Sequence, residues 1–293
     1  GSPNTEKIIN HLKTQTCLSM LEKLSAHSEQ INKFDFILND GFPVANKIGH
    51  QAGIPTFNIF HFTWSWFYAK CYPVSLITSE IAQMFEYEKL ATKNFIMPFT
   101  PSEIKSQLPK QVEINFITET VKIKKNTDLI TDKQQILIID SGFGHSSSTI
   151  NLIQESLSKI AQSNVEIYLF GSGEYASYPY VKQFDFLGQE EIQHRLQRAD
   201  LIVARPGFNL LTELLNLEKR AVFFYEKGNP EMIDLHYQLR NFSQFYFVNN
   251  DDLQNLDFWQ ERLSIDVTIK EKLLFNGASQ IVHHILESLN NGA

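Results

Sequence analysis

The sequence predicts an α/β fold in which parallel sheets are divided between two domains. From residue 136 onward, the order strand, loop and helix repeats at least four times. Leu201–Ala204 is a short apolar run with β-branched residues, of the kind that a parallel sheet buries on both faces. The 293 residues are enough for two domains of ordinary size.

The bulk composition excludes several classes of protein. A hydrophobic content of 43% and a charged content of 20% are typical of a soluble globular chain. The net charge of −7 argues against nucleic acid as a partner, because phosphate backbones require clustered Lys and Arg. Cys17 and Cys71 give neither a disulfide framework nor metal-ligand spacing, so we expect no metal site. Without a membrane-spanning run or a secretory signal, a cytoplasmic location is expected.

The first part of the chain predicts a helix followed by one strand–helix–strand unit. Apolar residues near helical spacing favour a helix over residues 4–33. Phe34–Leu38 and Ile54–Phe60 are predicted strands. The helix between them, Pro43–Ala52, begins with proline and is followed by Gly53, as helix ends favour.

The aromatic segment His61–Tyr68 directly follows a predicted strand, on the side of a parallel sheet where ligands bind. Packing of a following helix is the preferred interpretation for most of its rings. A helix is predicted over residues 74–92. Residues 94–109 contain three prolines and are interpreted as a connection between domains, and residues 110–134 are mainly polar and charged.

The second part predicts the alternation of a doubly wound sheet. Its predicted strands are 136–139, 165–170, 184–187, 201–204, 221–225 and 244–248. Its predicted helices are 149–161, 190–198, 210–217, 230–242 and 266–290.

Two glycine-bearing turns follow strands of this second sheet. The loop 140–148 lacks the third glycine of a dinucleotide fingerprint and the Gly-Lys-Ser/Thr of a P-loop. Arg205-Pro206-Gly207 ends the strand 201–204, and Gly207 permits a tight turn or the close approach of a ligand. Because helix N-termini carry unpaired N–H groups and a positive dipole end, the two turns together can hold a diphosphate.

Three segments resemble the two-Rossmann-domain glycosyltransferases of the GT-B fold. They are ADLIVARPGFNLLTE (199–213), RAVFFYEKGNPE (220–231) and DFILNDGFPVANKIGHQAGIPTFNIFHFTWSWFY (35–68). The resemblance is to MurG-like N-acetylglucosaminyl transferases and to the glycosyltransferase-like domain of the L-arabinokinase type. It implies a partial N-terminal, acceptor-side domain over residues 1–110 and a nucleotide-sugar-binding domain over 111–265. A C-terminal helix within 266–293 would pack back toward the first domain.

This resemblance implies transfer of a sugar from a nucleotide sugar, most often a UDP sugar, to an unknown acceptor, with no metal and no other cofactor. The sequence has no Asp-x-Asp pair near these loops, which agrees with metal independence. Glu213 would bind the ribose hydroxyls and Glu231 the sugar. The residues implied to surround the diphosphate are Gly207, Phe208 and Asn209, together with Ser141, Gly142, Phe143, Gly144 and His145.

Simpler interpretations stay open for several candidates. Asp40, at a strand end, is a candidate general base or the N-cap of the next helix. His61, the second catalytic candidate, and His145 are either ligand contacts or packing histidines. Arg205 either contacts phosphate or forms a surface ion pair, and Glu213 is alternatively a solvated carboxylate.

The resemblance also implies a departure from the family. The family's first domain starts with a strand, a Gly-rich loop and a helix, which supply part of the acceptor site and the general base. Here a predicted helix comes first, so about 60 residues of that domain are expected to be absent, at ~30 per βαβ unit. We therefore expect a fragment, a partner chain that supplies these strands at the exposed sheet edge, or a non-catalytic nucleotide-sugar sensor or scaffold.

Overall fold

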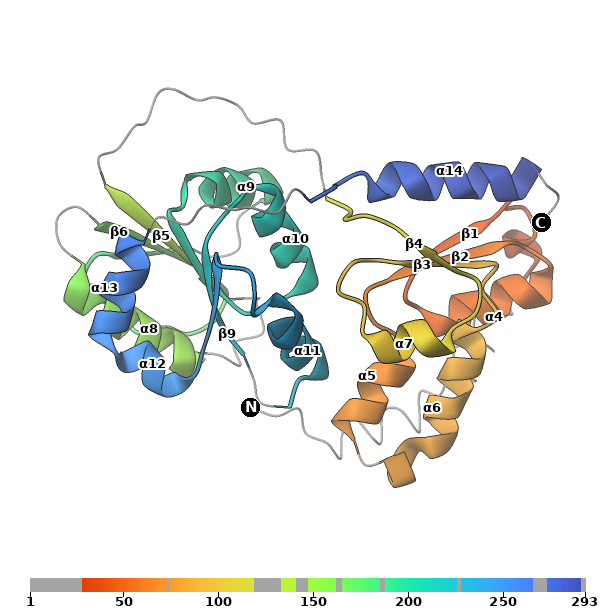
Figure 1. Cartoon of the computed structure of the whole chain (residues 1–293), viewed down its shortest axis with the longest axis horizontal. Coiled ribbons are helices and arrows are strands. Elements are labelled where there is room, and N and C mark those ends of the chain that lie inside the picture. The colour runs from red at the N-terminus through yellow and green to blue at the C-terminus, as the bar shows by residue number, and fades with distance from the viewer. Residues whose placement is uncertain are drawn as a thin grey trace. The chain divides into compact units, whose positions relative to one another are not determined.

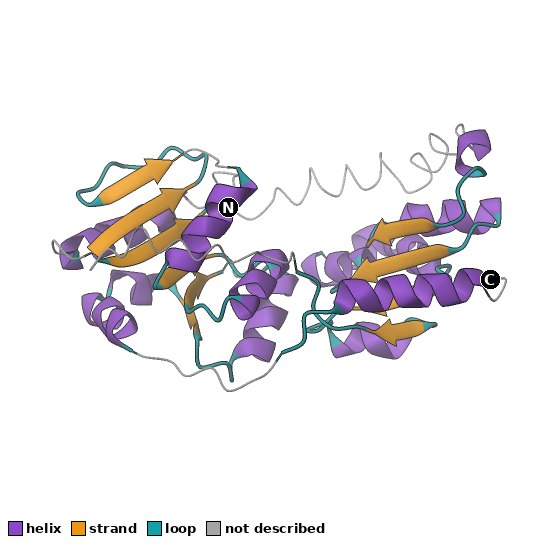
Figure 2. Cartoon of the chain, turned by 90° about the horizontal axis from the view of Figure 1, so that it is seen from above, coloured by secondary structure: helices purple, strands orange, loops and turns teal. Residues whose placement is uncertain are grey.

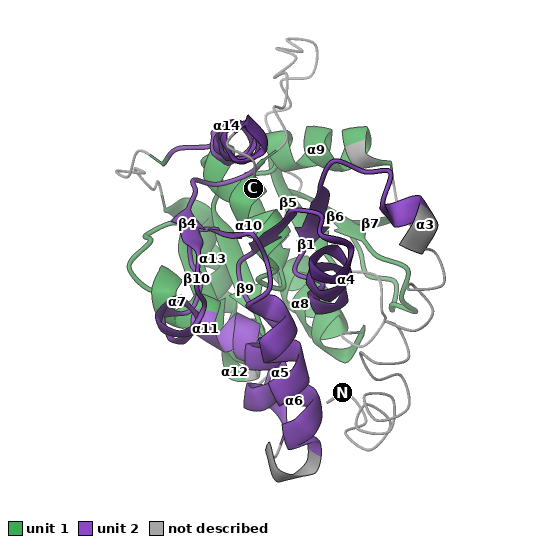
Figure 3. Cartoon of the chain, turned by 90° about the vertical axis from the view of Figure 1, so that its right-hand side faces the viewer, with its two compact units in different colours: residues 1, 118–227, 235–273 green, residues 2–117, 228–234, 274–293 purple. Residues whose placement is uncertain are grey.

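The computed structural model describes residues 28–72, 74–118, 133–140, 147–161, 165–184, 188–225, 228–265 and 273–290 (Figure 1). These residues divide into two compact units, each built on a parallel sheet (Figure 3). Unit 2 contains the chain up to residue 117, residues 228–234 and the chain from 274 onward. Unit 1 contains residues 118–227 and 235–273, so these divisions differ from the expected ones after residues 110 and 265.

Unit 2 has a four-stranded sheet in the order β1-β2-β3-β4. The strands are β1 (Ile37–Asp40), β2 (Thr56–Phe60), β3 (Lys93–Ile96) and β4 (Gln111–Glu113). The helices on one face are α4 (Pro43–Ala52), α5 (Trp64–Cys71), α6 (Val74–Glu88) and α7 (Ser102–Gln107), while α14 (Gly277–Asn290) lies on the other (Figure 1). The short helix α3 (Ser28–Ile31) precedes β1.

Helix α4 forms over the predicted residues. Pro43 stands at its first position, where the missing N–H would have no helical partner. Gly53 ends it with a φ of 68°, and its N–H group bonds the carbonyls of Gly49 and His50. Because this left-handed conformation is unfavourable for residues with a Cβ, glycine fixes the end of the helix.

Three buried asparagines lie side by side across the sheet of unit 2. Asn39, Asn58 and Asn94 occupy paired positions of β1, β2 and β3. The amide of Asn39 donates to Asn58 at 3.1 Å, and that of Asn58 donates to Asn94 at 3.2 Å. A one-residue slip would move these side chains to the opposite face, so the buried network fixes the register of the strands.

Two predictions for unit 2 are wrong. The first strand begins at Ile37 rather than Phe34, and Phe34 is 63% exposed. The predicted connection over residues 94–109 contains most of β3 and all of α7. The three prolines of this segment lie outside β3 and α7. They therefore interrupt neither element, since a proline breaks a strand or helix only from within it.

Unit 1 has a six-stranded parallel sheet in the order β10-β9-β8-β5-β6-β7. Its strands are β5 (Gln134–Ile139), β6 (Val165–Phe170), β7 (Val181–Phe184), β8 (Leu201–Ala204), β9 (Ala221–Phe224) and β10 (Phe245–Val248). The chain runs from β5 outward to β7, returns to β8 on the other side of β5, and runs outward again to β10. This is the doubly wound order, whose ligand crevice lies where the direction of winding changes.

Helices cover both faces of this sheet, as Figure 2 also shows. One face carries α8 (Ser147–Ile160), α12 (Asn250–Gln254) and α13 (Leu256–Ser264), and the other carries α9 (Gln189–Arg198) and α10 (Phe208–Asn216). Helix α11 (Pro230–Leu239) begins in the segment assigned to unit 2 and ends in unit 1. Strand β7 begins at Val181 rather than at the predicted Phe184, and the predicted strand residues 185–187 lie outside the described residues.

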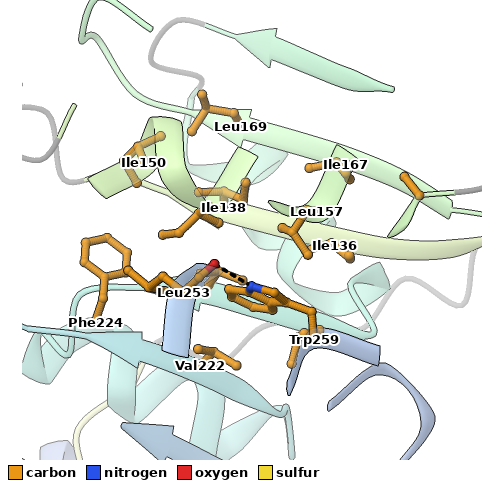
Figure 4. Close-up of a cluster of buried hydrophobic side chains, with 14 of the residues drawn as sticks. Ile136, Ile138, Ile150, Leu157, Ile167, Leu169, Val222, Phe224, Leu253 and Trp259 are labelled. Carbon is orange, nitrogen blue, oxygen red and sulfur yellow. Dashed lines mark hydrogen bonds between the residues drawn. The ribbon is translucent and has the colours of Figure 1, made fainter. Parts of the chain in front are cut away.

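The core of unit 1 lies between the sheet and helices α8, α12 and α13. Ile136 and Ile138 of β5 pack with Leu157 of α8 and with Trp259 of α13 (Figure 4). Trp259 is fully buried, and its indole N–H donates to the carbonyl of Leu253 at 3.0 Å. Each fully buried aliphatic side chain contributes about 1.5–3 kcal/mol.

Helix α14 starts against the segment that follows β4. The N–H group of Gly277 donates to the carbonyl of Phe116 at 3.0 Å, and a Cβ at this position would lie 2.9 Å from the same oxygen. Glycine therefore permits the close approach. The helix was predicted from residue 266, but residues 266–272 lie outside the described part of the chain. Within that part, no helix has the length and apolar character needed to cross a membrane.

Candidate functional site

The change of winding in unit 1 lies between β5 and β8, which pair with Ile139 beside Ala204. Asp140 follows β5 and Arg205 follows β8, so both residues lie at the carboxyl edge of the sheet. The loop that contains Ser141, Gly142, Phe143, Gly144 and His145 lies outside the described residues. Its expected contact with phosphate stays a prediction.

Arg205 forms a buried ion pair at this edge. Its Nη2 atom is 3.7 Å from Oδ1 of Asp140, and their side chains are 13% and 0% exposed. Arg205 therefore forms an ion pair, but the interpretation that this pair lies on the surface is wrong. Tyr175, in the loop after β6, donates from its hydroxyl to Oδ2 of Asp140 at 2.7 Å. Burial and this bond to Asp140 raise the pKa of Tyr175 to about 12.

Helix α10 begins beside Arg205 without a side-chain cap. Gly207 is its N-cap residue, with an ordinary extended conformation, and the first turn contains no acidic side chain. A Cβ at Gly207 would meet no atom within 4 Å, so the protein's own packing leaves room above this residue. An uncapped helix start with open space beside it suits an anionic ligand.

The remaining predicted residues on α10 differ in exposure. Phe208 is buried, so only its backbone can contribute to a ligand site, whereas Asn209 is exposed. Glu213 lies in the second turn with a partly exposed side chain. Its assignment to ribose stays a prediction.

In unit 2, Asp40 and His61 stand at the carboxyl ends of the neighbouring strands β1 and β2. The carboxylate of Asp40 is exposed and makes no hydrogen bond or ion pair with a described residue. It does not cap α4, because Oδ1 of Asn39 accepts the hydrogen bond from the backbone N–H of Phe42 at 2.8 Å. The capping interpretation of Asp40 is therefore wrong.

The structure brings two predicted site residues of unit 2 together. Nε2 of His61 lies 3.0 Å from Oε1 of Glu231, and each side chain is 19% exposed. Glu231 is in the first turn of α11, within the segment that belongs to unit 2. A carboxylate in this position can orient the imidazole.

The structure also shows a buried carboxylate that no sequence pattern pointed to. Glu88, the last residue of α6, is 1% exposed and accepts from the backbone N–H of Ser65 at 3.0 Å and from the Ser65 hydroxyl. Burial raises the pKa of Glu88 to about 7, and the bonds from Ser65 oppose this shift. Glu88 therefore accepts hydrogen bonds from the first turn of α5.

Most aromatic side chains of the segment 61–68 pack against one another. The ring of Phe62 lies 5.4 Å from that of Trp64 and 5.3 Å from that of Phe67. Trp64 is 37% exposed, whereas Phe62 and Phe67 are partly buried. These contacts agree with the packing interpretation.

No protein-family model matches the sequence, and no curated protein matches it. Solved structures match almost the whole chain. The glycotransferase of kitacinnamycin aligns with 99% of this chain and 80% of its own, at 13% identity and a TM-score of 0.62. The spinosyn rhamnosyltransferase SpnG, complexed with thymidine diphosphate, aligns with 98% of this chain and 77% of its own, at 10% identity and a TM-score of 0.60.

The chain has the GT-B fold. A third similar structure, S. aureus MnaA with UDP, aligns with 98% of this chain and 82% of its own, at 12% identity and a TM-score of 0.61. The predicted α/β architecture with Rossmann-like sheets is confirmed. Among the described residues of this GT-B chain, no three His, Cys, Asp or Glu side chains lie close enough together to hold a metal ion.

Proposed function

We propose that this chain is a glycosyltransferase whose donor is a nucleoside-diphosphate sugar, with a UDP sugar as the first candidate. An acceptor hydroxyl attacks the anomeric carbon, the bond to the diphosphate breaks, and a base takes the hydroxyl proton. Neither a metal nor another cofactor takes part, because backbone N–H groups and Arg205 stabilise the charge of the leaving diphosphate.

The start of α10 is the observation that carries this proposal. It lies where the winding of a doubly wound sheet changes, which is the general ligand position of such sheets. It has no side-chain cap, no acidic residue in its first turn and open space at Gly207. Phe208 and Asn209 would contribute backbone N–H groups, the loop 141–145 would cover the phosphates, and Glu213 would bind the ribose.

The candidates for proton transfer come from unit 2. His61 is the first, because Glu231 holds its imidazole at 3.0 Å and compensates the charge that it gains with the proton. Asp40 is the second, as an exposed carboxylate at the adjacent strand end. Glu231 has two carboxylate oxygens and can also accept a hydrogen bond from a sugar hydroxyl.

Two matched glycine substitutions test the donor site. Gly188 and Gly207 are both N-cap residues without a side-chain cap, and a Cβ at either would meet no atom within 4 Å. Both alanine variants should therefore fold with unchanged melting temperatures. Only Gly207→Ala should weaken UDP or dTDP binding in calorimetry, by about tenfold, because its methyl group occupies the space for the diphosphate. Equal affinities of the two variants would remove the donor site from the start of α10.

A second candidate is a subunit of a split glycosyltransferase, in which this chain binds the donor and a partner chain completes the acceptor side. The edge strand β1 and its flanks favour it, because Phe34, Phe36, Leu38 and Phe42 are 63%, 37%, 51% and 39% exposed. Donor turnover decides between the candidates. Hydrolysis of UDP-sugar donors by the chain alone, lost in His61→Ala, supports the complete enzyme, whereas UDP binding without turnover supports the split subunit or a sensor.

A further inference from the structure

Three polar side chains connect the ends of three neighbouring strands in unit 1. Tyr175 follows β6, Asp140 follows β5 and Arg205 follows β8. The Tyr175 hydroxyl accepts a hydrogen bond from the N–H group of Gly173 at 3.1 Å and donates to Oδ2 of Asp140 at 2.7 Å. Oδ1 of the same carboxylate lies 3.7 Å from Nη2 of Arg205. We call these three residues the tyrosine relay.

Two glycines, Gly171 and Gly173, allow the side chain of Tyr175 to reach Asp140. The tyrosine ring lies over the turn Gly171-Ser172-Gly173, and a Cβ at Gly173 would lie 2.6 Å from Cζ of the ring. A Cβ at Gly171 would lie 3.0 Å from Cβ of Asp140. Real Cβ atoms do not approach other atoms as closely as the first of these distances. Both glycines are therefore needed for the observed position of the tyrosine hydroxyl.

The geometry of the relay is poor for stability alone. Asp140 is 2% exposed, yet its Oδ1 atom has no hydrogen-bond partner, and the ion pair to Arg205 is longer than a hydrogen bond. A buried acceptor in this state is destabilising. The contact therefore compensates the charge of the carboxylate without occupying an N–H donor of the Arg205 guanidinium.

We propose that Tyr175 and Asp140 are positioning residues that hold the Arg205 guanidinium at the carboxyl end of β8, facing the diphosphate of the donor. The inference rests on the proposed function, because it assigns the phosphate contact to Arg205. Tyr175 fixes the plane of the Asp140 carboxylate through Oδ2, and the negative charge on Oδ1 attracts the Arg205 guanidinium across 3.7 Å. Neither Tyr175 nor Asp140 needs to touch the ligand.

Tyr175→Phe tests the relay, because it removes one hydroxyl and leaves the ring. The matched control is Tyr168→Phe on β6, which removes a hydroxyl that also donates to a carboxylate, Glu166, at 2.7 Å. Tyr175→Phe should weaken UDP or dTDP binding about three- to tenfold. It should leave the affinity for uridine, which has no phosphate, unchanged, and Tyr168→Phe should bind all three ligands as the wild type does. Gly173→Ala, which displaces the ring, should reproduce the effect if Tyr175→Phe does not fold.

A double-mutant cycle with Arg205→Gln separates positioning from a structural effect. If Tyr175 acts through Arg205, Tyr175→Phe should change UDP affinity little in the Arg205→Gln background. A full effect in that background, or wild-type affinity of Tyr175→Phe for UDP, overturns the relay while the donor site stands. Absence of UDP and dTDP binding by the wild-type chain overturns the donor site and the relay with it.

Discussion

The replacement of Glu88 by glutamine should change how the stability of unit 2 depends on pH. Glu88 is buried at the N-terminal end of α5, where Thr63, Trp64 and Ser65 all provide hydrogen bonds to its carboxylate. Burial nevertheless dominates and raises its pKa from the ordinary 4.5 to about 7. The folded protein therefore binds this proton more tightly than the unfolded chain does.

The sign and size of the effect follow from that shift. Between pH 4.5 and 7 the folded state carries more protons than the unfolded state, so the Glu88 contribution to stability falls as pH rises through this window. A change of the pKa from 4.5 to about 7 corresponds to about 3 kcal/mol in total, most of which falls between pH 5 and 8. Glu88→Gln removes the titration. Its free energy of unfolding should rise relative to that of the parent by this amount across the range.

Urea denaturation followed by tryptophan fluorescence measures the effect in unit 2. Trp64 and Trp66 lie in α5, and a Trp259→Phe background removes the tryptophan of unit 1. Glu86→Gln is the control, since Glu86 lies on the same helix and its side chain is 64% exposed. Its pH dependence should equal that of the parent. A Glu88→Gln difference that stays constant from pH 5 to 8, or changes with the opposite sign, would refute the reasoning, because hydrogen bonding would then cancel or outweigh the effect of burial.

Three further substitutions test the packing of the fold by thermal and urea unfolding. Asn58→Leu should destabilise unit 2 by about 2–4 kcal/mol, because it leaves Asn39 and Asn94 without their buried partner. A loss of stability smaller than that caused by Asn209→Ala, at an exposed residue, would contradict the network. Gly277→Ala should cost about 1–3 kcal/mol, since its Cβ would press on the carbonyl of Phe116, whereas Gly188→Ala should cost almost nothing. Trp259→Phe should cost unit 1 about 1–3 kcal/mol through the lost bond to Leu253 and the lost volume, and a neutral result would show that the core repacks there.

Local sequence signals predicted the elements that depend on local chemistry. Helix α4 lies between Pro43 and Gly53 as predicted, and β6 and β8 occupy the predicted residues because each is a mostly apolar and mostly buried run. Strand β1 was misplaced because its buried position is polar. Asn39 is satisfied by Asn46 and Asn58, which are 7 and 19 residues away in the chain. No apolar pattern reports such a partner.

The candidate site divides in the same way. Arg205 and Gly207 were identified from a turn that follows a buried strand, which is a local pattern. Tyr175 was not, because its bond to Asp140 joins residues 35 apart and depends on two glycines that resemble an ordinary loop. His61 and Glu231 lie 170 residues apart, so both were candidate site residues but their contact was not predicted.

A comparison of the starts of α5 and α10 explains why we propose the anion site at α10. Both helices follow the carboxyl end of a parallel strand, and both present the positive end of a helix dipole there. At α5 the chain supplies its own hydrogen-bond acceptors, because Glu88 accepts from Ser65 while Thr63 caps the backbone of Trp66. At α10 a glycine takes the cap position and the first turn has no acidic side chain.

A ligand phosphate at α5 would have to displace a buried carboxylate, whereas at α10 it would fill open space beside Gly207. The two helix starts are therefore chemically similar but not equally available, and only α10 can accept an external anion without first breaking the protein's own bonds.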